Sequence, residues 1–239
     1  MTQKIIFYYH PTPNSSKVAL FLEENELQYL IKPIDILRGD QHSPEFVALN
    51  PNRKLPVIVD EDIVIFDSTA ILLHLAQKTG RFLGGSNFPI RTELIQWLMF
   101  ISSGIGPFTG QAIHFKYYAP AGQGYADHRY SFEAERHWTI INERLKNRRY
   151  LVDDEYSIAD MSLWGWCHGL QYLIGEDVWK RFPEVGRHFS EINARPAAQR
   201  ASQLASRHSF KQDTDDETRV SLFRHGQPQP TMATSPEVL

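Results

Sequence analysis

Polar residues at the starts of two predicted helices are the side chains of this 239-residue chain best placed for binding chemistry. Thr12 and Asn14 lie in the turn before the first helical pattern, and Asp67 and Ser68 come immediately before a later one. The start of a helix presents free N–H groups and the positive end of the helix dipole, which attract carboxylates. The pattern therefore predicts a carboxylate-binding site at Asp67 and Ser68, and polar donors at Thr12 and Asn14.

The single cysteine, Cys167, lies in an apolar helical run, so we expect a buried packing residue rather than a nucleophile. One cysteine allows no intrachain disulfide, no Cys-x-x-Cys redox pair and no zinc cluster. The chain also lacks the Gly-x-Ser-x-Gly, P-loop and His-Glu-x-x-His motifs. These patterns argue against a metal site and against a hydrolase with a self-contained triad.

The charge and the apolar runs restrict the partners and the compartment. The formal net charge of −3 argues against a nucleic-acid binder, which needs a basic face. The apolar run at 5–9 is too short for a signal peptide, and no run approaches the ~18 apolar residues of a membrane span. A single cysteine fits a reducing compartment. We expect a cytoplasmic protein that binds neither nucleic acid nor membranes.

Two regions with different periodicity make up the chain. In the first, apolar patterns of strand and helix alternate in the order βαβ and then ββα. The strands are predicted at 5–9, 29–34, 55–59 and 63–66, and the main helices after Asn14 and at 69–78. In the second region only helices are predicted, at 90–101, 129–145, 158–173 and 184–192. The expected units are a domain at 1–83, a linker at 84–89, a helical domain at 90–210 and a tail at 211–239.

The order of these motifs resembles the glutathione transferases. Lys54-Leu55-Pro56 precedes the third strand, and Asp67-Ser68 precedes the last helix of the first domain. The segment 11–14, Pro-Thr-Pro-Asn, is similar to the nu class of bacteria and to its fungal nitrogen-regulator relatives, and Ser157 to Asp160 forms a capping box in the second domain. The resemblance implies an α/β plus all-α protein, with a thioredoxin-like N-terminal domain (βαβ-ββα) followed by a helical-bundle C-terminal domain.

The resemblance also implies a binding site for glutathione. Pro56 would follow a cis peptide bond, so that the backbone of Leu55 pairs with the cysteinyl unit. Ser68 would bind the γ-glutamyl carboxylate and Asp67 its ammonium, whereas Gln41 and Lys54 would meet the glycyl end. Arg136, two helical turns from Arg129, would meet a carboxylate of a second glutathione or of the partner subunit's glutathione.

The resemblance favours Asn14 and Thr12 as the catalytic residues that activate the glutathione thiol. A free thiol has a pKa near ~8.5, and only its thiolate is nucleophilic. Tyr8 and Tyr9 are alternatives, because some transferase classes use a tyrosine hydroxyl near the end of this strand. Ser15 and Ser16 are further alternatives by analogy with the serine-type classes.

The resemblance implies glutathione-dependent reduction of small disulfides by a homodimer. One glutathione, two glutathiones or the oxidised dimer could occupy each site, and no metal is required. Two alternatives stay open, namely conjugation of glutathione to electrophilic substrates and a non-catalytic regulator that binds glutathione. The electrophile pocket would be built from second-domain side chains such as Phe108, Phe115, Tyr117 and Trp166.

Overall fold

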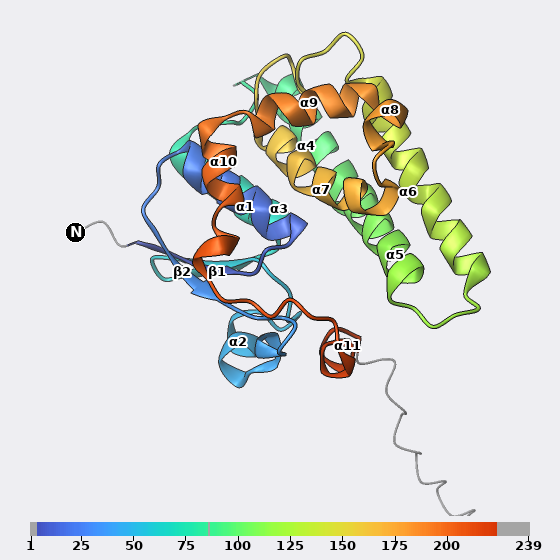
Figure 1. Cartoon of the computed structure of the whole chain (residues 1–239). Helices are drawn as coiled ribbons and strands as arrows, with labels where there is room; N and C mark the ends of the chain where they lie inside the picture. Colours follow the sequence, from blue (N-terminus) through green and yellow to red (C-terminus); the bar gives the residue numbers. More distant parts are fainter. Residues whose placement is uncertain (1–3, 86, 224–239) are drawn as a thin grey trace, which may run out of the picture.

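The N-terminal part of the protein is a four-stranded sheet with helices on both faces (Figure 1). The structure is a computed structural model that describes residues 4–85 and 87–223. The strands are β1 (Ile5–Tyr9), β2 (Tyr29–Pro33), β3 (Val57–Asp60) and β4 (Ile63–Phe66). Their order is β2-β1-β3-β4; β1 and β2 are parallel, and the β1–β3 and β3–β4 pairs are antiparallel. The predicted βαβ-ββα order is confirmed.

Alternation along β1 decides which helix packs on which face. Ile5, Phe7 and Tyr9 belong to the large apolar cluster with α1 (Pro13–Glu24) and α3 (Ser68–Thr79). Tyr8 points to the opposite face and packs against Phe46 of α2 (Pro44–Leu49). The strand therefore holds α1 and α3, which carry the predicted site residues, against one side of the sheet.

The C-terminal part of the described chain consists of helices alone, as predicted. They are α4 (Phe88–Phe100), a π-helix (Ile101–Ile105), α5 (Gly106–Tyr117), α6 (Gly124–Arg144), α7 (Ile158–Ile174), α8 (Val178–Arg181), α9 (Pro183–Asn193) and α10 (Pro196–Ser202). None of the helices within residues 4–85 and 87–223 is long and apolar enough to cross a membrane.

Helix boundaries differ from the predicted ones where local propensity is low. The sequence gives no separate prediction for α5, because its start contains two glycines and a proline, all poor helix formers. Similarly, α6 begins five residues before the predicted 129, in a glycine-containing segment. Packing stabilises both helices, since Trp138 of α6 donates a buried hydrogen bond to Thr109 of α5 at 2.9 Å. The short α10 was also not predicted.

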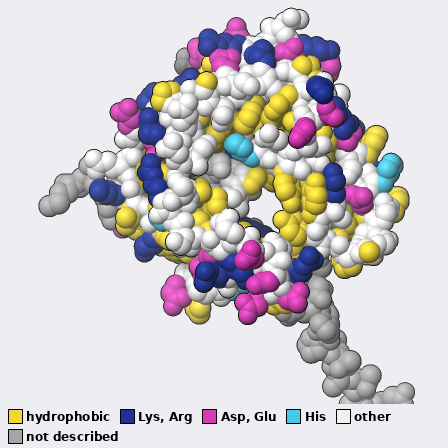
Figure 2. All heavy atoms as spheres, viewed as in Figure 1, with side chains coloured by type: hydrophobic (Ala, Val, Ile, Leu, Met, Phe, Trp, Pro, Cys, Tyr) yellow, Lys and Arg dark blue, Asp and Glu magenta, His cyan; other side chains and the backbone are white. Residues whose placement is uncertain are grey.

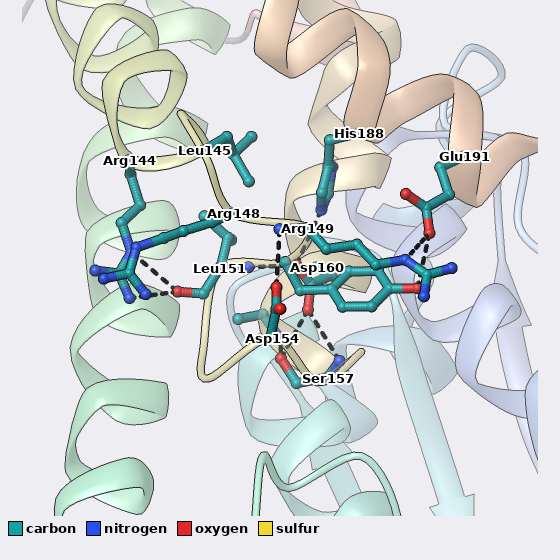
Figure 3. A network of polar contacts seen from close by, with 12 residues as sticks. Arg144, Leu145, Arg148, Arg149, Leu151, Asp154, Ser157, Asp160, His188 and Glu191 are labelled. Atoms are coloured by element: carbon teal, nitrogen blue, oxygen red, sulfur yellow. Dashed lines mark hydrogen bonds and ion pairs between the residues drawn. The ribbon is translucent and has the colours of Figure 1, made fainter.

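The predicted capping box at the start of α7 is confirmed, and it is the centre of a buried polar network (Figure 3). One carboxylate oxygen of Asp160 accepts the Ser157 N–H and hydroxyl, each at 2.9 Å. The other oxygen accepts the Leu151 N–H and pairs with His188 Nε2, also at 2.9 Å. Asp160 and His188 have no exposed side-chain surface, so this network joins α7, α9 and the preceding loop inside the core.

Helix α7 also joins the two parts of the molecule by close packing against α1. A Cβ atom at Gly165 would lie 2.4 Å from the Pro13 carbonyl oxygen and 2.6 Å from Lys17 Cγ. Only a residue without a side chain permits this approach, because real Cβ contacts are longer. Gly165 thus fixes the distance between α7 and the start of α1, where predicted site residues lie.

Residues 211–223 of the predicted tail pack on the N-terminal part of the molecule and include the short helix α11 (Asp216–Leu222) (Figure 1). Thr218 of α11 is fully buried and donates to the Leu37 carbonyl at 3.1 Å. Tertiary contacts therefore order a polar segment whose composition predicts no helix. Residues 224–239 of the predicted tail lie outside the described residues.

Candidate glutathione site between the two domains

A cavity of about 600 Å³ lies between the start of α1, the start of α3 and the helical part of the molecule. Figure 2 shows a hollow in the face that Figure 1 presents, among the ends of α1 and α5 and helix α11. Its volume is in the range of about 300–1,000 Å³ that is typical of small-ligand sites. The predicted site residues in its wall are Thr12, Asn14, Gln41, Lys54, Leu55, Asp67 and Ser68.

The start of α1 places Thr12 and Asn14 at the cavity. Thr12 is the N-cap of the helix, and its Oγ1 accepts the Ser15 N–H at 3.3 Å. Pro13 occupies the first helical position, where a missing N–H costs no hydrogen bond. The Ser15 and Ser16 hydroxyls bond Thr12 instead, and neither serine is among the described residues of the wall.

The start of α3 places a carboxylate and a hydroxyl beside Asn14. Asp67 is the N-cap, and its Oδ1 accepts the N–H groups of Thr69 and Ala70 at 2.9 and 3.1 Å. Its φ of +72° is a strained conformation for a residue other than glycine. Ser68, the next residue, donates to Asn14 Oδ1 at 3.5 Å. Two helix starts therefore converge on one point of the cavity.

The peptide bond between Leu55 and Pro56 is cis, as predicted. Leu55 and Lys54 line the cavity, and the Lys54 carbonyl accepts the Asn50 side-chain amide at 2.7 Å. Pro56 itself is not among the described lining residues. Its contribution is the cis bond that precedes strand β3.

Gln41 lies at the cavity, but its amide is already engaged within the chain. Its Nε2 donates to the Ile36 carbonyl at 3.3 Å and to the Ser221 hydroxyl at 3.1 Å. The residue is 5% exposed, and Oε1 is buried without a hydrogen-bond partner among the described residues. Gln41 therefore lies in the cavity wall with its amide N–H groups engaged by the chain.

Sequence analysis missed Lys17, a charged residue buried beneath the two helix starts. Lys17 is 1% exposed, lines the cavity and donates to the Ser68 hydroxyl at 3.4 Å. Burial lowers its pKa to about 7, although the Asp67 carboxylate acts in the opposite direction. The spacing in the sequence could have indicated this position, because Lys17 follows Asn14 by three residues and therefore lies on the same face of the helix.

Thr69 is a second lining residue that the sequence did not single out. It is the second residue of α3 and is 3% exposed. Its Oγ1 is buried and has no hydrogen-bond partner within the described parts of the chain. A buried hydroxyl in a cavity wall is costly unless a ligand or water satisfies it, so this end of the cavity is suited to a polar ligand.

The helical part of the molecule forms the apolar wall of the cavity. Trp166 lies there, with Lys17 Nζ 5.7 Å from the centre of its ring. Of the four residues predicted for an electrophile pocket, Trp166 alone is among the described lining residues. Phe115 stacks on Tyr130 and Tyr117 packs on Tyr172, so these aromatic rings stabilise contacts between helices.

Several alternatives for the chemistry lie away from the cavity. Tyr9 is buried, which raises its pKa to about 12, and Tyr8 packs on Phe46. Cys167 is fully buried, and burial raises the pKa of its thiol. Arg136 pairs with Glu133 and is not among the described lining residues. The structure therefore does not bring Arg136 to the cavity of its own chain.

Comparison with known proteins identifies relatives along most of the chain. The family description "Glutathione S-transferase, N-terminal domain" matches residues 3–77, and "Glutathione S-transferase, C-terminal domain" matches residues 113–200. The disulfide-bond oxidoreductase YfcG of Escherichia coli is 39% identical over 211 residues, which covers 82% of this chain and 94% of that protein.

Solved structures agree with this assignment. A glutathione transferase from Burkholderia graminis, with two glutathione molecules per subunit, has a TM-score of 0.79 and 36% identity, covering 86% of this chain and 90% of that one. A glutathione transferase from Pseudomonas putida, with one glutathione disulfide per subunit, has a TM-score of 0.78 and 34% identity, covering 84% and 91%. The fold, the matched domains and these relatives together show that the chain belongs to the glutathione S-transferase family.

Proposed function

We propose that the protein reduces disulfides with glutathione and supplies no reactive atom of its own. The observation that carries the proposal is the convergence of Asn14, Ser68 and Lys17 in one cavity, while the single cysteine is buried elsewhere. An enzyme without a usable thiol needs one from a bound molecule. The relatives support this choice, since YfcG is named a disulfide-bond oxidoreductase and solved neighbours bind glutathione or its disulfide.

The cavity fits the three parts of the tripeptide. The start of α3 suits the γ-glutamyl carboxylate, because Ser68 and Thr69 offer hydroxyls at the positive end of the helix dipole. The second oxygen of Asp67 can take the ammonium, since Oδ1 already caps the helix. The Leu55 backbone before the cis proline can pair with the cysteinyl unit in the manner of an added strand. The glycyl end then extends toward Lys54 and Gln41.

Asn14 and Thr12 are the residues that we expect to hold the thiolate. Bound glutathione supplies a thiolate that attacks the substrate disulfide, and a second glutathione completes the exchange to yield glutathione disulfide and two product thiols. Ser68 donates to Asn14 Oδ1, so the Asn14 amide N–H group is left to face the sulfur. One hydrogen bond to a charged group contributes about 1.5–3 kcal/mol, which lowers a thiol pKa by about 1–2 units.

The proposal is tested by turnover of a small dialkyl disulfide at saturating glutathione, followed through formation of glutathione disulfide. Asn14→Asp keeps the size but places a negative charge beside the thiolate, so the rate near neutral pH should fall about tenfold or more. Asn87→Asp is the matched control, because Asn87 caps α4 and Asp caps equally well. An Asn14→Asp rate equal to that of wild type contradicts the assignment.

Conjugation to electrophiles is a second candidate, supported by the Trp166 ring in the cavity wall. An apolar electrophile could pack there while the thiolate attacks it. Parallel assays with a disulfide and with an aryl halide separate the two activities. Conjugation faster than disulfide reduction would make the transferase reaction the main one.

We also propose that the protein is a homodimer. Large apolar side chains are exposed on β4, α4 and α6, and they are Ile63, Val64, Phe66, Phe88, Ile95, Met99, Tyr125 and Phe132. A partner subunit packed on these elements would remove this apolar surface from water. The predicted role of Arg136 belongs to this proposal, because α6 could carry it toward the partner's cavity.

A further inference from the structure

The segment 211–223, here called the strap, crosses from the N-terminal part of the molecule to α5 beside the cavity (Figure 1). Its first residue donates a backbone N–H to the Asp35 carboxylate at 2.7 Å. Near its end, Arg219 donates to the Tyr118 carbonyl at 3.3 Å, and the Phe223 ring packs on Tyr118. The strap is therefore fixed to both parts of the molecule.

The strap covers the end of the cavity that holds Gln41. The Ser221 hydroxyl donates to the Ile36 carbonyl at 2.9 Å and accepts the Gln41 amide at 3.1 Å. The Ser221 carbonyl pairs with His42 Nε2 at 2.9 Å. Ser221 and Leu222 are themselves part of the cavity wall. Gln41 and His42 are thus held in place by the strap.

The loop beneath the strap is shaped to receive it. Gly39 has a φ of +92°, a conformation that side-chain-bearing residues rarely adopt. A Cβ atom there would lie 3.4 Å from Ser221 Oγ, an ordinary van der Waals distance, so the strap lies beside the loop at this point. Thr218 of the strap is fully buried, and its hydroxyl donates to the Leu37 carbonyl of the loop. The match of Thr218, Ser221 and Gly39 indicates a built contact rather than an incidental one.

We infer that the strap closes the glycyl end of the cavity and thereby selects the unextended tripeptide over thiols lengthened at the glycyl carboxylate. The inference rests on the proposed function, which places the glycyl end toward Gln41 and Lys54. Any residue added beyond the glycyl unit meets Ser221 and Leu222. The strap lies beyond residue 200, where the match to the family's C-terminal domain ends.

The experiment compares three thiol peptides as reductants of the same small disulfide. They are γ-Glu-Cys-Gly, its C-terminal amide, and the pentapeptide γ-Glu-Cys-Gly-Ala-Ala. The amide removes the charge without adding bulk, so it separates loss of the carboxylate from steric exclusion. For the wild-type chain, kcat/KM for the pentapeptide should be about tenfold or more below that for the amide, as exclusion by a shaped pocket requires.

Two full-length variants release the strap to different degrees. Thr218→Val with Ser221→Ala removes its side-chain hydrogen bonds to the loop, and Thr218→Pro removes the Thr218 hydroxyl together with the N–H that donates to the Asp215 cap of α11. In both variants, kcat/KM for the amide divided by kcat/KM for the pentapeptide should fall by about threefold or more, because the contacts that hold the strap in place are lost. Val220→Ala is the matched control, since Val220 lies on the same helix and is 47% exposed.

The outcomes separate the two proposals. Equal use of pentapeptide and amide by the wild-type chain, or a ratio that neither strap variant changes, overturns the role of the strap. Absence of disulfide turnover with every thiol peptide counts against the proposed function instead. A lowered amide-to-pentapeptide ratio of kcat/KM in either strap variant, with the ratio of Val220→Ala equal to that of wild type, supports the inference.

Discussion

Replacement of Lys17 by methionine should make the protein more stable and less active, with both differences largest at low pH. Methionine has a similar length and no charge, so it fits the same buried position. The Lys17 side chain is 1% exposed, and burial lowers its pKa from the ordinary 10.5 to about 7. A difference of this size corresponds to about 5 kcal/mol of unfavourable burial when the lysine is charged.

The sign of the pH dependence follows from which state binds the proton. Between about pH 7 and 10.5 the unfolded chain keeps the Lys17 proton while the folded chain has lost it. The free energy of unfolding of the wild type therefore rises with pH in this window. The Lys17→Met chain lacks this slope, so its stability advantage should shrink by about 3 kcal/mol between about pH 6 and about pH 9.

The effect on activity follows from the position of the charge. Lys17 Nζ is 3.4 Å from Ser68 Oγ, which is 3.5 Å from Asn14 Oδ1. A thiolate held beyond Asn14 is then at most about 10 Å away, where two charges at an effective dielectric constant of about 20 interact by at least about 1.7 kcal/mol. Removal of the charge should raise the thiol pKa by about one unit, and the activity loss should disappear above the pKa of Lys17.

Denaturant unfolding and disulfide turnover at about pH 6 and about pH 9 measure both effects on the same variants. The ultraviolet absorbance of the bound thiolate reports its pKa directly. Lys180→Met is the control, because Lys180 has an 84% exposed side chain and lies away from the cavity. A Lys17→Met protein that is less stable than wild type at about pH 6, or a rate ratio independent of pH, would refute the reasoning.

Three further predictions concern packing, the buried network and assembly. Gly165→Ala should lower the unfolding free energy by about 1–3 kcal/mol and also the disulfide turnover, because its Cβ meets the Pro13 carbonyl that begins α1; denaturation and kinetics on one preparation check this. Asp160→Asn should destabilise by about 2–4 kcal/mol, since two buried N–H groups, a hydroxyl and His188 lose a charged acceptor; an unchanged denaturation midpoint would contradict it. Phe132→Asp should convert the proposed dimer to a monomer, measured by light scattering across a concentration series.

Most of the N-terminal fold could be predicted from the sequence because its local signals agree with its packing. The apolar run of β1 and the cap at Asp67 each indicate the element that the structure contains. Helix α5 could not be found in this way, since its starting residues favour other conformations and only contacts with α6 and α7 stabilise it. The same reason hides α11, whose buried Thr218 has a partner more than 180 positions away.

The candidate site also contains residues with local sequence signals and residues whose role depends on tertiary contacts. Residues at helix starts could be proposed, because capping and dipole arguments apply to any helix. Lys17 could not, because its burial depends on Trp166 and Ser68, which are distant in the sequence. The engagement of Gln41 by Ser221 is likewise a tertiary fact. Sequence reasoning thus located the two ends of the cavity but not the charge beneath it.

Two unfavourable features meet at the cavity, and both are held by packing from outside it. Asp67 has a strained positive φ, and Lys17 is a buried amine. The cap of α3 holds the Asp67 backbone in its conformation, and the close packing of α7 at Gly165 holds the Lys17 side chain in its buried position. A strained backbone and a buried amine both lower stability, and we expect such residues at this cavity because ligand binding requires them. Substitutions that relieve either cost should therefore raise stability and reduce glutathione-dependent turnover together, whereas stabilising changes at exposed sites such as Lys180 should leave turnover unchanged.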